Sequence, residues 1–468
     1  MLFNSIIFLL FLPCVFAGYW LLPAKWRNAF LLTASYYFYF SYNPWFLLLL
    51  IGTSVLDFYL AKAISNSSDE KQRKALLIFS LVSNIGVLFI FKYFIFVYNS
   101  FGTLFNSDFL ILNYLIIPAG LSFYTFQSIS YTIDVYRNKY KATDTLQEFL
   151  LFVSFFPHMV AGPIMRHNDL MPQLIKRHYI KSIDWESFAK LTIWGFFKKM
   201  VIADNIALLV DPVFNDVENF SGSTLLFAGF LFVIQVYADF SGYSDIATGV
   251  AKLFGINLSL NWKRPLLSTS LHQFWKRWHI SLTTWFRDYL YIGLGGNRVT
   301  YSRWLFNIFF VFFISGLWHG SSFPVILWGT LHGLFYILEI IFLPKIKQTK
   351  LTKIIGWFYL ISIHTLTLTI FRAQSLYDVK VIFKNIFTDF NCSNFVTEIT
   401  QINDLFFIAL CVSFIILLFL KELNEEFSML HNIKGYYSAL KPTFYIIALV
   451  SLFLLGNFNT NPFFYFQF

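Results

Sequence analysis

A histidine inside an apolar stretch is the residue best suited to chemistry in this sequence. His319 lies in the hexapeptide SGLWHG of residues 315–320, near the end of a long hydrophobic segment. An ionisable residue within such a segment is a functional hypothesis by default. Burial disfavours the imidazolium, so we expect a neutral His319 that can accept a proton. The alternative is a packing histidine bonded to a carbonyl, but the flanking glycines, which allow close backbone approach, favour function.

Residues 261–298 alternate aromatic rings with cations. Arg and Lys side chains could hold phosphates there and indoles could stack on a base, which suits an anionic donor that carries a nucleotide. The alternative is an interfacial belt, with Trp at the lipid headgroups and the cations in water. That belt leaves unexplained why so many polar groups crowd one loop. The candidate donor-binding residues are Asn261, Lys263, Arg264, Trp275, Lys276, Arg277, Trp278 and Trp318.

Two apolar segments, 111–133 and 223–250, carry too many polar groups to face lipid on every side. Such groups either line a cavity or bind neighbouring helices, and both interpretations stay open. The carboxylates within 223–250 need partners, which we expect from the basic loop that follows. The candidate cavity-lining residues are Tyr124, Gln127, Asp239, Tyr243 and Asp245.

Two further histidines, His332 and His364, also lie in apolar segments. Neither has neighbouring residues with metal-ligand spacing, so we interpret both as structural. The three cysteines, Cys14, Cys392 and Cys411, show no metal or redox spacing either. We therefore expect no metal and no tightly bound cofactor.

The composition indicates how these residues are positioned. Only 13% of the 468 residues are charged and 57% are hydrophobic, whereas soluble domains carry roughly 25% charged residues. The chain is therefore predicted to be an all-α, polytopic membrane protein. The net charge of +10 suits basic loops that fix orientation, so we expect no nucleic-acid partner. Residues 1–23 lack a basic start and are interpreted as a retained helix rather than a signal peptide.

Hydropathy predicts about 11–13 membrane-spanning or re-entrant helices, at roughly 20 apolar residues per span. Residues 146–164 contain Pro157 and a Gly-Pro pair, so a broken or re-entrant helix is expected there. The expected spans are 3–22, 28–42, 45–64, 75–98, 111–133, 188–211, 223–250, 304–319, 323–343, 354–371, 403–421 and 442–458.

Basic loops alternate with loops that carry few or no cations, which predicts the orientation. Both termini are expected outside, and the vestibule loop 251–303 is expected in the cytoplasm, provided that 146–164 returns to the side it entered from. Segment 374–390 has helical apolar spacing and is expected to lie flat on the outer surface. We see no internal repeat and predict one membrane domain over 1–468. The basic loops are 65–74, 134–145, 165–187, 251–303, 344–353 and 421–441.

Several motifs together resemble the membrane-bound O-acyltransferases, specifically the bacterial branch whose members O-acetylate alginate or peptidoglycan. The resemblance covers nearly the whole chain and is specific only as a set. The motifs are 121–127 (LSFYTFQ), 131–137 (YTIDVYR), 156–157 (FP), 161–164 (AGPI), 239–245 (DFSGYSD), 261–265 (NWKRP), 274–281 (FWKRWHIS), 316–320 (GLWHG) and 465–468 (YFQF).

The resemblance implies a helical shell around a tunnel, with His319 as the catalytic residue and His279 as a second, upstream polar residue. It implies acetyl-CoA as a cytoplasmic donor, and acetyl delivery outside the bacterial inner membrane, either directly or through an extracytoplasmic SGNH-type transferase as partner. We expect peptidoglycan as the acceptor, with alginate or another exopolysaccharide as the alternative. His279 would lie on the cytoplasmic side and His319 further towards the outside.

A different class of function is a transporter of an anionic or lipid-linked substrate without chemistry. The lack of a visible repeat counts mildly against it, because transporters are often built from inverted repeats. The two classes differ in whether labelled acetyl-CoA is consumed.

Overall fold

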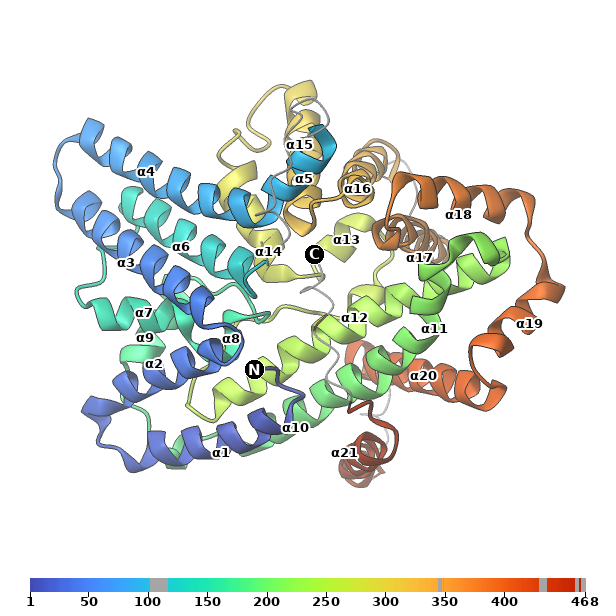
Figure 1. The fold of residues 1–468 in the computed structure, drawn as a ribbon, viewed down its shortest axis with the longest axis horizontal. Helices are drawn as coiled ribbons and strands as arrows, with labels where there is room; N and C mark the ends of the chain where they lie inside the picture. The colour runs from blue at the N-terminus through green and yellow to red at the C-terminus, as the bar shows by residue number, and fades with distance from the viewer. Residues whose placement is uncertain (102–116, 344–346, 348, 429–435, 459–462, 464–468) are drawn as a thin grey trace. The chain divides into compact units, whose positions relative to one another are not determined.

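The computed structural model describes residues 1–468 except 102–116, 344–346, 348, 429–435, 459–462 and 464–468 (Figure 1). The regular elements of these described ranges are all helices, which confirms the expected all-α class. The C-terminal motif at 465–468 and the start of the expected span 111–133 lie outside the described residues.

Among the described residues, seven helices of 19 to 31 residues are long and apolar enough to cross a membrane. Each matches an expected span within a few residues, so the chain is a multi-pass membrane protein. Two shorter apolar helices are α1 (Ile6–Leu21) and residues 442–455 of α21 (Tyr436–Leu455). The seven are α3 (Pro44–Asn66), Glu70–Tyr98 (which begins with α4, Glu70–Leu88), α12 (Gly222–Lys252), α15 (Tyr301–His319), α16 (Phe323–Phe342), α17 (Lys350–Arg372) and α20 (Leu405–Phe427).

The remaining helices are shorter or broken. The stretch 146–164 forms α7 and α8, separated at Phe155, whose backbone leaves the helical region (φ −52°, ψ 108°). A broken helix was expected there. The other α-helices of the described ranges are α2 (Ala24–Phe40), α5 (Phe94–Phe101), α6 (Leu121–Tyr136), α7 (Leu146–Ser154), α8 (Phe156–Met159), α9 (His167–Ile175), α10 (Trp185–Phe196), α11 (Asp204–Asn215), α13 (Leu271–Trp275), α14 (Ile280–Trp285), α18 (Leu376–Thr388) and α19 (Cys392–Ile402), and the π-helix η5 (Phe197–Ala203) lies between α10 and α11.

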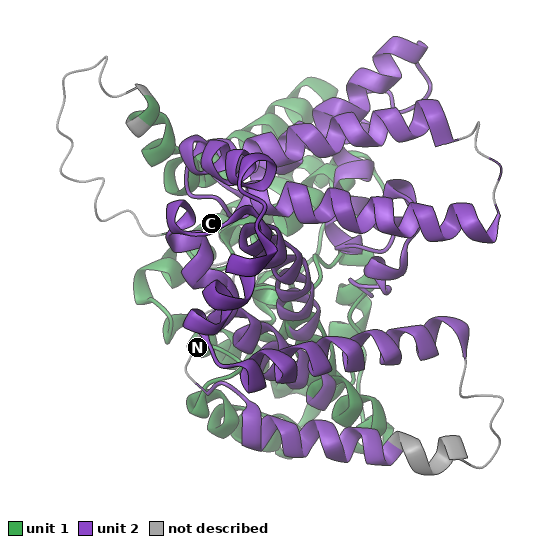
Figure 2. Ribbon diagram, turned by 90° about the vertical axis from the view of Figure 1, so that its right-hand side faces the viewer, with its two compact units in different colours: residues 1–192, 243–259, 465–467 green, residues 193–242, 260–464, 468 purple. Residues whose placement is uncertain are grey.

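The chain divides into two compact units, coloured separately in Figure 2. Unit 1 comprises 1–192, 243–259 and 465–467, and unit 2 comprises 193–242, 260–464 and 468. Helix α12 supplies residues to both. The single domain expected over 1–468 stays a prediction.

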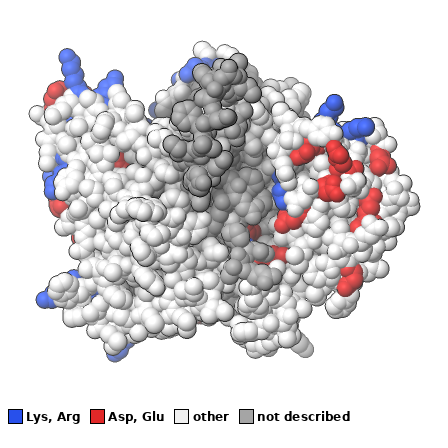
Figure 3. All heavy atoms as spheres, viewed as in Figure 1, with Lys and Arg blue, Asp and Glu red and all other residues white. Residues whose placement is uncertain are grey.

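In unit 2, segment 372–402 folds onto the end of α11 and the start of α12. The Arg372 guanidinium binds Asp211 at 2.9 Å, and the Tyr377 hydroxyl donates to Glu218 at 2.9 Å. The amphipathic segment expected at 374–390 forms α18. Figure 3 shows carboxylates gathered at the right, where Figure 1 places α18 and α19, while much of the rest of that face carries no charge.

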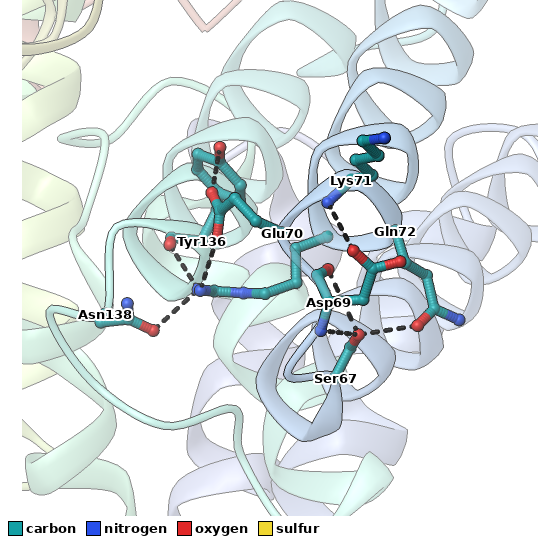
Figure 4. A network of polar contacts seen from close by, with 8 residues as sticks. Ser67, Asp69, Glu70, Lys71, Gln72, Tyr136 and Asn138 are labelled. Atoms are coloured by element: carbon teal, nitrogen blue, oxygen red, sulfur yellow. Dashed lines mark hydrogen bonds and ion pairs between the residues drawn. The ribbon is translucent and has the colours of Figure 1, made fainter.

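In unit 1, the loops before α4 and after α6 lie side by side (Figure 4). The Arg73 guanidinium donates to the carbonyl of Tyr136 at 2.6 Å and to Asn138 Oδ1 at 2.7 Å. The Tyr136 hydroxyl in turn donates to Glu70 at 2.8 Å. The sequence predicts both loops on one face of the membrane, and these bonds agree.

Candidate functional site

His319 is the last residue of α15, and its side chain is 5% exposed. The helix ends there because Gly320 is fully extended, and α16 begins after three residues with Pro324 in its first turn, where proline fits. The histidine therefore lies at the reversal between two apolar helices.

Glycines bring α15 and α16 into backbone contact next to this reversal. A Cβ atom on Gly329 would lie 2.6 Å from Gly316 Cα and 2.7 Å from the carbonyl oxygen of Phe312. Neither distance leaves room for a side chain. The close approach expected at the glycines flanking His319 is confirmed at Gly316.

Three aromatic rings contact the His319 imidazole. Its ring centroid lies 4.9 Å from that of Trp318, 5.0 Å from that of Trp328 and 6.2 Å from that of Phe371. The three contacts are close to edge-on, with interplanar angles of 77° to 88°. The imidazole therefore lies among aromatic side chains of α15, α16 and α17.

His279 is also buried, at 1% exposure, and contacts the same tryptophan. Its ring centroid lies 6.3 Å from that of Trp318 and 4.5 Å from that of Phe240, and the ring is parallel to Trp262 at 5.8 Å. Trp318 therefore contacts both imidazoles, and the expectation that His279 lies on the cytoplasmic side stays a prediction. Burial lowers the pKa of His279 to about 3, so its ring is neutral.

The backbone of His279 is left-handed (φ 42°, ψ 55°), which is costly for a residue with a side chain. Asn261 holds this turn. Its carbonyl accepts from the Ile280 amide at 2.9 Å, and its Oδ1 accepts from the Ser281 amide at 3.1 Å and hydroxyl at 2.9 Å. Asn261, expected to bind the donor, therefore serves to position His279.

The four cations expected at the donor phosphates differ in their surroundings. Arg264 and Arg277 both bind the Glu426 carboxylate of α20, at 2.7 and 2.9 Å. Lys263 and Lys276 are exposed. The two arginines join the loops 251–303 and 421–441, which the sequence places on one face. A phosphate-binding role for the four stays a prediction.

The tryptophans of this loop are buried rather than placed at a surface belt. Trp278 lies 4.6 Å from Trp262 between ring centroids, and Trp275 lies 5.4 Å from His332. Both indoles are less than 10% exposed. The interfacial-belt interpretation therefore fails for these two residues.

The partner of Asp239 comes from an earlier helix. Lys199 of η5 binds Asp239 at 2.7 Å and also Asp204 at 2.8 Å. The expectation that the following basic loop supplies this partner is wrong, since the lysine precedes α12. Asp245 of the same helix is half-buried.

The other candidate cavity-lining residues lie in unit 1 and pack within it. The Gln127 side-chain amide donates to the Phe152 carbonyl at 2.7 Å, and the Tyr243 ring stacks on Phe3 at 4.7 Å. Tyr124 is 2% exposed. A tunnel-lining role for them stays a prediction.

The two histidines interpreted as structural have hydrogen bonds to their own bundle. Thr367 Oγ1 donates to the Ile363 carbonyl at 2.7 Å, so it accepts from His332 Nε2 at 2.9 Å. His364 Nδ1 donates to the Leu360 carbonyl at 2.9 Å. These bonds fix both tautomers and fit the structural interpretation.

Sequence reasoning missed the aromatic residues that contact the two imidazoles. Phe240 and Trp262 lie inside motifs that carry the resemblance, so their positions were visible without their role. Trp328 and Phe371 had no signal beyond being aromatic residues in apolar spans. The cation of the buried ion pair, Lys199, was hidden within an expected span.

Known proteins match this chain over the same region. The model of the MBOAT, membrane-bound O-acyltransferase family, matches residues 143–371, which include both histidines of the site. A probable alginate O-acetylase AlgI of Pseudomonas aeruginosa is 38% identical over 391 residues, covering 80% of this chain and 73% of that protein.

The names of two further relatives refer to other polymers. A peptidoglycan O-acetyltransferase of Helicobacter pylori is 33% identical over 411 residues, covering 80% of this chain and 78% of that protein. A teichoic acid D-alanyltransferase of Streptococcus thermophilus is 31% identical over 251 residues, covering 51% of this chain and 59% of that protein.

Proposed function

This chain belongs to the membrane-bound O-acyltransferase family, and on that premise we propose that it moves an acetyl group from acetyl-CoA to an envelope polysaccharide. The observation that carries the proposal is His319, a buried histidine at the end of an apolar helix, whose imidazole contacts three aromatic rings. A neutral imidazole in a dry site is suited to accept a proton from a hydroxyl.

The chemistry needs only a base and an activated donor. His319 takes the proton from an acceptor hydroxyl as its oxygen attacks the thioester carbonyl. The new C–O bond forms, the C–S bond breaks, and the proton passes from the imidazole to the CoA thiolate. Holding the two reactants in one dry site supplies much of the acceleration.

An alternative order of steps uses a covalent intermediate. The His319 imidazole attacks the thioester carbonyl, the C–S bond breaks and CoA leaves as its thiol with the imidazole proton. The acceptor hydroxyl then attacks the acyl-imidazole, the C–N bond breaks, and the hydroxyl proton returns to the imidazole. Rapid mixing with labelled acetyl-CoA alone separates the two routes. Label that stays on the peptide containing His319 after quenching supports the covalent route, and its absence supports direct transfer.

The donor enters, in this proposal, from the cytoplasmic side of the bacterial inner membrane. Lys263 and Lys276 are the cations best placed to bind its phosphates, because Arg264 and Arg277 are held by Glu426. His279 orients the donor or relays the proton. The acceptor approaches from the outer side, and an SGNH-type transferase there is the proposed partner.

Acetyl transfer is tested with the purified full-length chain and acetyl-CoA labelled in the acetyl group. Label moving to a hydroxyl acceptor, or steady hydrolysis of the thioester, supports the enzyme. Intact donor with uptake of an unmodified anionic or lipid-linked substrate into vesicles would instead show a transporter.

The acceptor is tested in cells. We propose an extracytoplasmic polysaccharide, with peptidoglycan and alginate as the two polymers that the relatives' names suggest. Mass analysis of wall and secreted sugars, with and without the gene, identifies the one that loses O-acetyl groups. Loss of D-alanyl esters instead would contradict the acetyl assignment.

A further inference from the structure

A buried ion cluster lies on α12 next to Phe240, the residue of that helix that packs against His279. Lys199 Nζ binds one carboxylate oxygen each of Asp204 and Asp239, at 2.8 and 2.7 Å, and all three side chains are about 5% exposed. Burying charges is expensive, and the gain in stability from such a pair is small. A cluster kept at that cost within an apolar protein calls for a role beyond stability.

The π-helix η5 directs two successive lysines to α12. Lys198 Nζ donates to Ser241 Oγ at 2.9 Å, next to the Lys199–Asp239 pair. Just beyond, a Cβ atom on Gly242 would lie 2.8 Å from the Gly195 carbonyl oxygen and 3.0 Å from the Lys199 amide. Helix η5 is therefore bonded and closely packed to one turn of α12. Single π-helical turns of this kind are frequent at functional sites.

The same turn of α12 also faces His279. In the sequence, Phe240 lies between Asp239 and Ser241, the two residues that bind the lysines. The centroid of its ring is 4.5 Å from that of His279 and 4.9 Å from that of Trp262. Tyr237, one turn earlier, donates its hydroxyl to Glu422 of α20. Any shift of this turn would move the ring that touches His279.

We propose that the Lys199–Asp239 ion pair, together with the Lys198–Ser241 bond, is a positioning device for His279 that acts through Phe240. The inference rests on the proposed function, because His279 is assigned to the reaction only there. The ion pair fixes the axial position and the rotation of α12. Because the Phe240 ring contacts the His279 imidazole, it then also fixes the position of that imidazole. Misplacing a reacting group by about 1 Å can cost about 10²-fold in rate.

Asp204 provides a matched control within the same cluster. It binds the same ammonium group at nearly the same distance, and it is equally buried. It belongs to α11, five residues along the same continuous helical run as Lys199, so it does not connect Lys199 to α12. A purely structural role for the cluster predicts equal effects of losing either carboxylate.

The test compares Asp239→Asn with Asp204→Asn in the purified full-length protein, with kcat and KM measured for labelled acetyl-CoA. We expect a 10- to 100-fold loss of kcat with little change in KM for Asp239→Asn, and less than a threefold loss for Asp204→Asn. Thermal unfolding of both variants should shift by similar amounts. Equal losses of kcat would overturn the inference.

Two further variants keep the test decisive if Asp239→Asn fails to fold. Ser241→Ala removes only the Lys198 bond, and we expect a three- to tenfold loss of kcat, so an unchanged kcat counts against the device. The Phe240→Ala variant lacks the ring through which the ion pair would act on His279. Adding Asp239→Asn to this variant should therefore lower kcat little further. Multiplying losses would show that the two act independently.

Failure of this inference is distinct from failure of the proposed function. If Asp239→Asn and Asp204→Asn behave alike while His319→Ala is inactive, only the positioning role is lost. If His319→Ala keeps full activity, the proposed function itself is lost.

Discussion

Two pairs of buried histidines in unit 2 differ in where the backbone places them. His332 and His364 lie well inside α16 and α17, and each has a ring nitrogen bonded within the bundle, to Thr367 and to the Leu360 carbonyl. His279 and His319 lie where helices begin or end, one in a left-handed turn and the other as the last residue of α15, and both adjoin Trp318.

The comparison shows that burial alone does not distinguish a candidate catalytic histidine from a structural one. All four imidazoles are at most 5% exposed, so exposure does not separate them. A histidine inside a helix finds a partner one turn away, as His364 does, and contributes to packing. His279 and His319, which lie at the start and the end of helices, instead share contact with the Trp318 ring. Backbone position therefore separates the structural pair from the candidate catalytic pair.

The largest effect is expected for His319→Ala. Removing the base should lower the rate of acetyl transfer about 10³-fold or more, because general-base catalysis alone supplies about 10²- to 10⁴-fold. The measurement is transfer from labelled acetyl-CoA by protein that purifies at normal yield and unfolds at the wild-type temperature. If such protein kept activity within tenfold of wild type, His319 would not be the base, and the distinction between a catalytic and a structural pair of histidines would be wrong.

A smaller loss is expected for His279→Ala. An orienting or proton-relaying residue should contribute about 10²-fold, less than the base itself. Steady-state kinetics with acetyl-CoA measure it, and Gln at position 279 tests whether a neutral hydrogen-bonding group suffices. A loss as large as that of His319→Ala would make the two histidines equal partners.

The structural pair should behave in the opposite way. His332→Leu removes the donor to Thr367 and should lower the free energy of unfolding by about 1–3 kcal/mol, with kcat within about threefold of wild type. Thermal unfolding in detergent and the transfer assay are measured on the same sample. A large loss of kcat without loss of stability would move His332 to the catalytic group.

A further effect on stability appears only at acid pH. The pKa of His279 is lowered to about 3 by burial, against an ordinary value of 6.5. Above pH 6.5 the ring is neutral in both the folded and the unfolded chain. As pH falls from 6.5 towards 3, only the unfolded chain takes up this proton, so stability falls by up to about 1.4 kcal/mol per pH unit.

Replacing His279 with Gln should therefore flatten the acid side of the stability curve. Unfolding temperatures measured between pH 7 and 4.5 should drop less in this variant than in wild type. An identical drop would mean that the ring titrates normally and is not held neutral by its aromatic neighbours.

Local sequence sufficed to predict the seven long apolar helices and to single out His319 as a candidate. Length and hydropathy decide whether a segment can cross the membrane, and α12 and α16 follow the expected ranges closely. An ionisable residue stands out within such a segment, so the position of His319 is evident from its apolar neighbours in the chain. The family resemblance then added His279.

Pairings between distant segments were beyond local sequence. Lys199 and Asp239 are separated by α11, a loop and half of α12, and Glu426 lies far along the chain from the arginines it binds. Helical periodicity says which face of a helix is apolar, but it does not say which helix packs on it. The burial of His279 depends on three rings from three segments, so it could not be predicted without knowing how these segments pack.

The contact between Gly316 and Gly329 restricts how the site can open. Two backbones that touch have no side chain that can rotate aside, so α15 and α16 can separate only by moving as whole helices. If His319 is the base proposed above, its substrates would have to approach past the side chains around it, such as Phe371 of α17, and not between these two backbones.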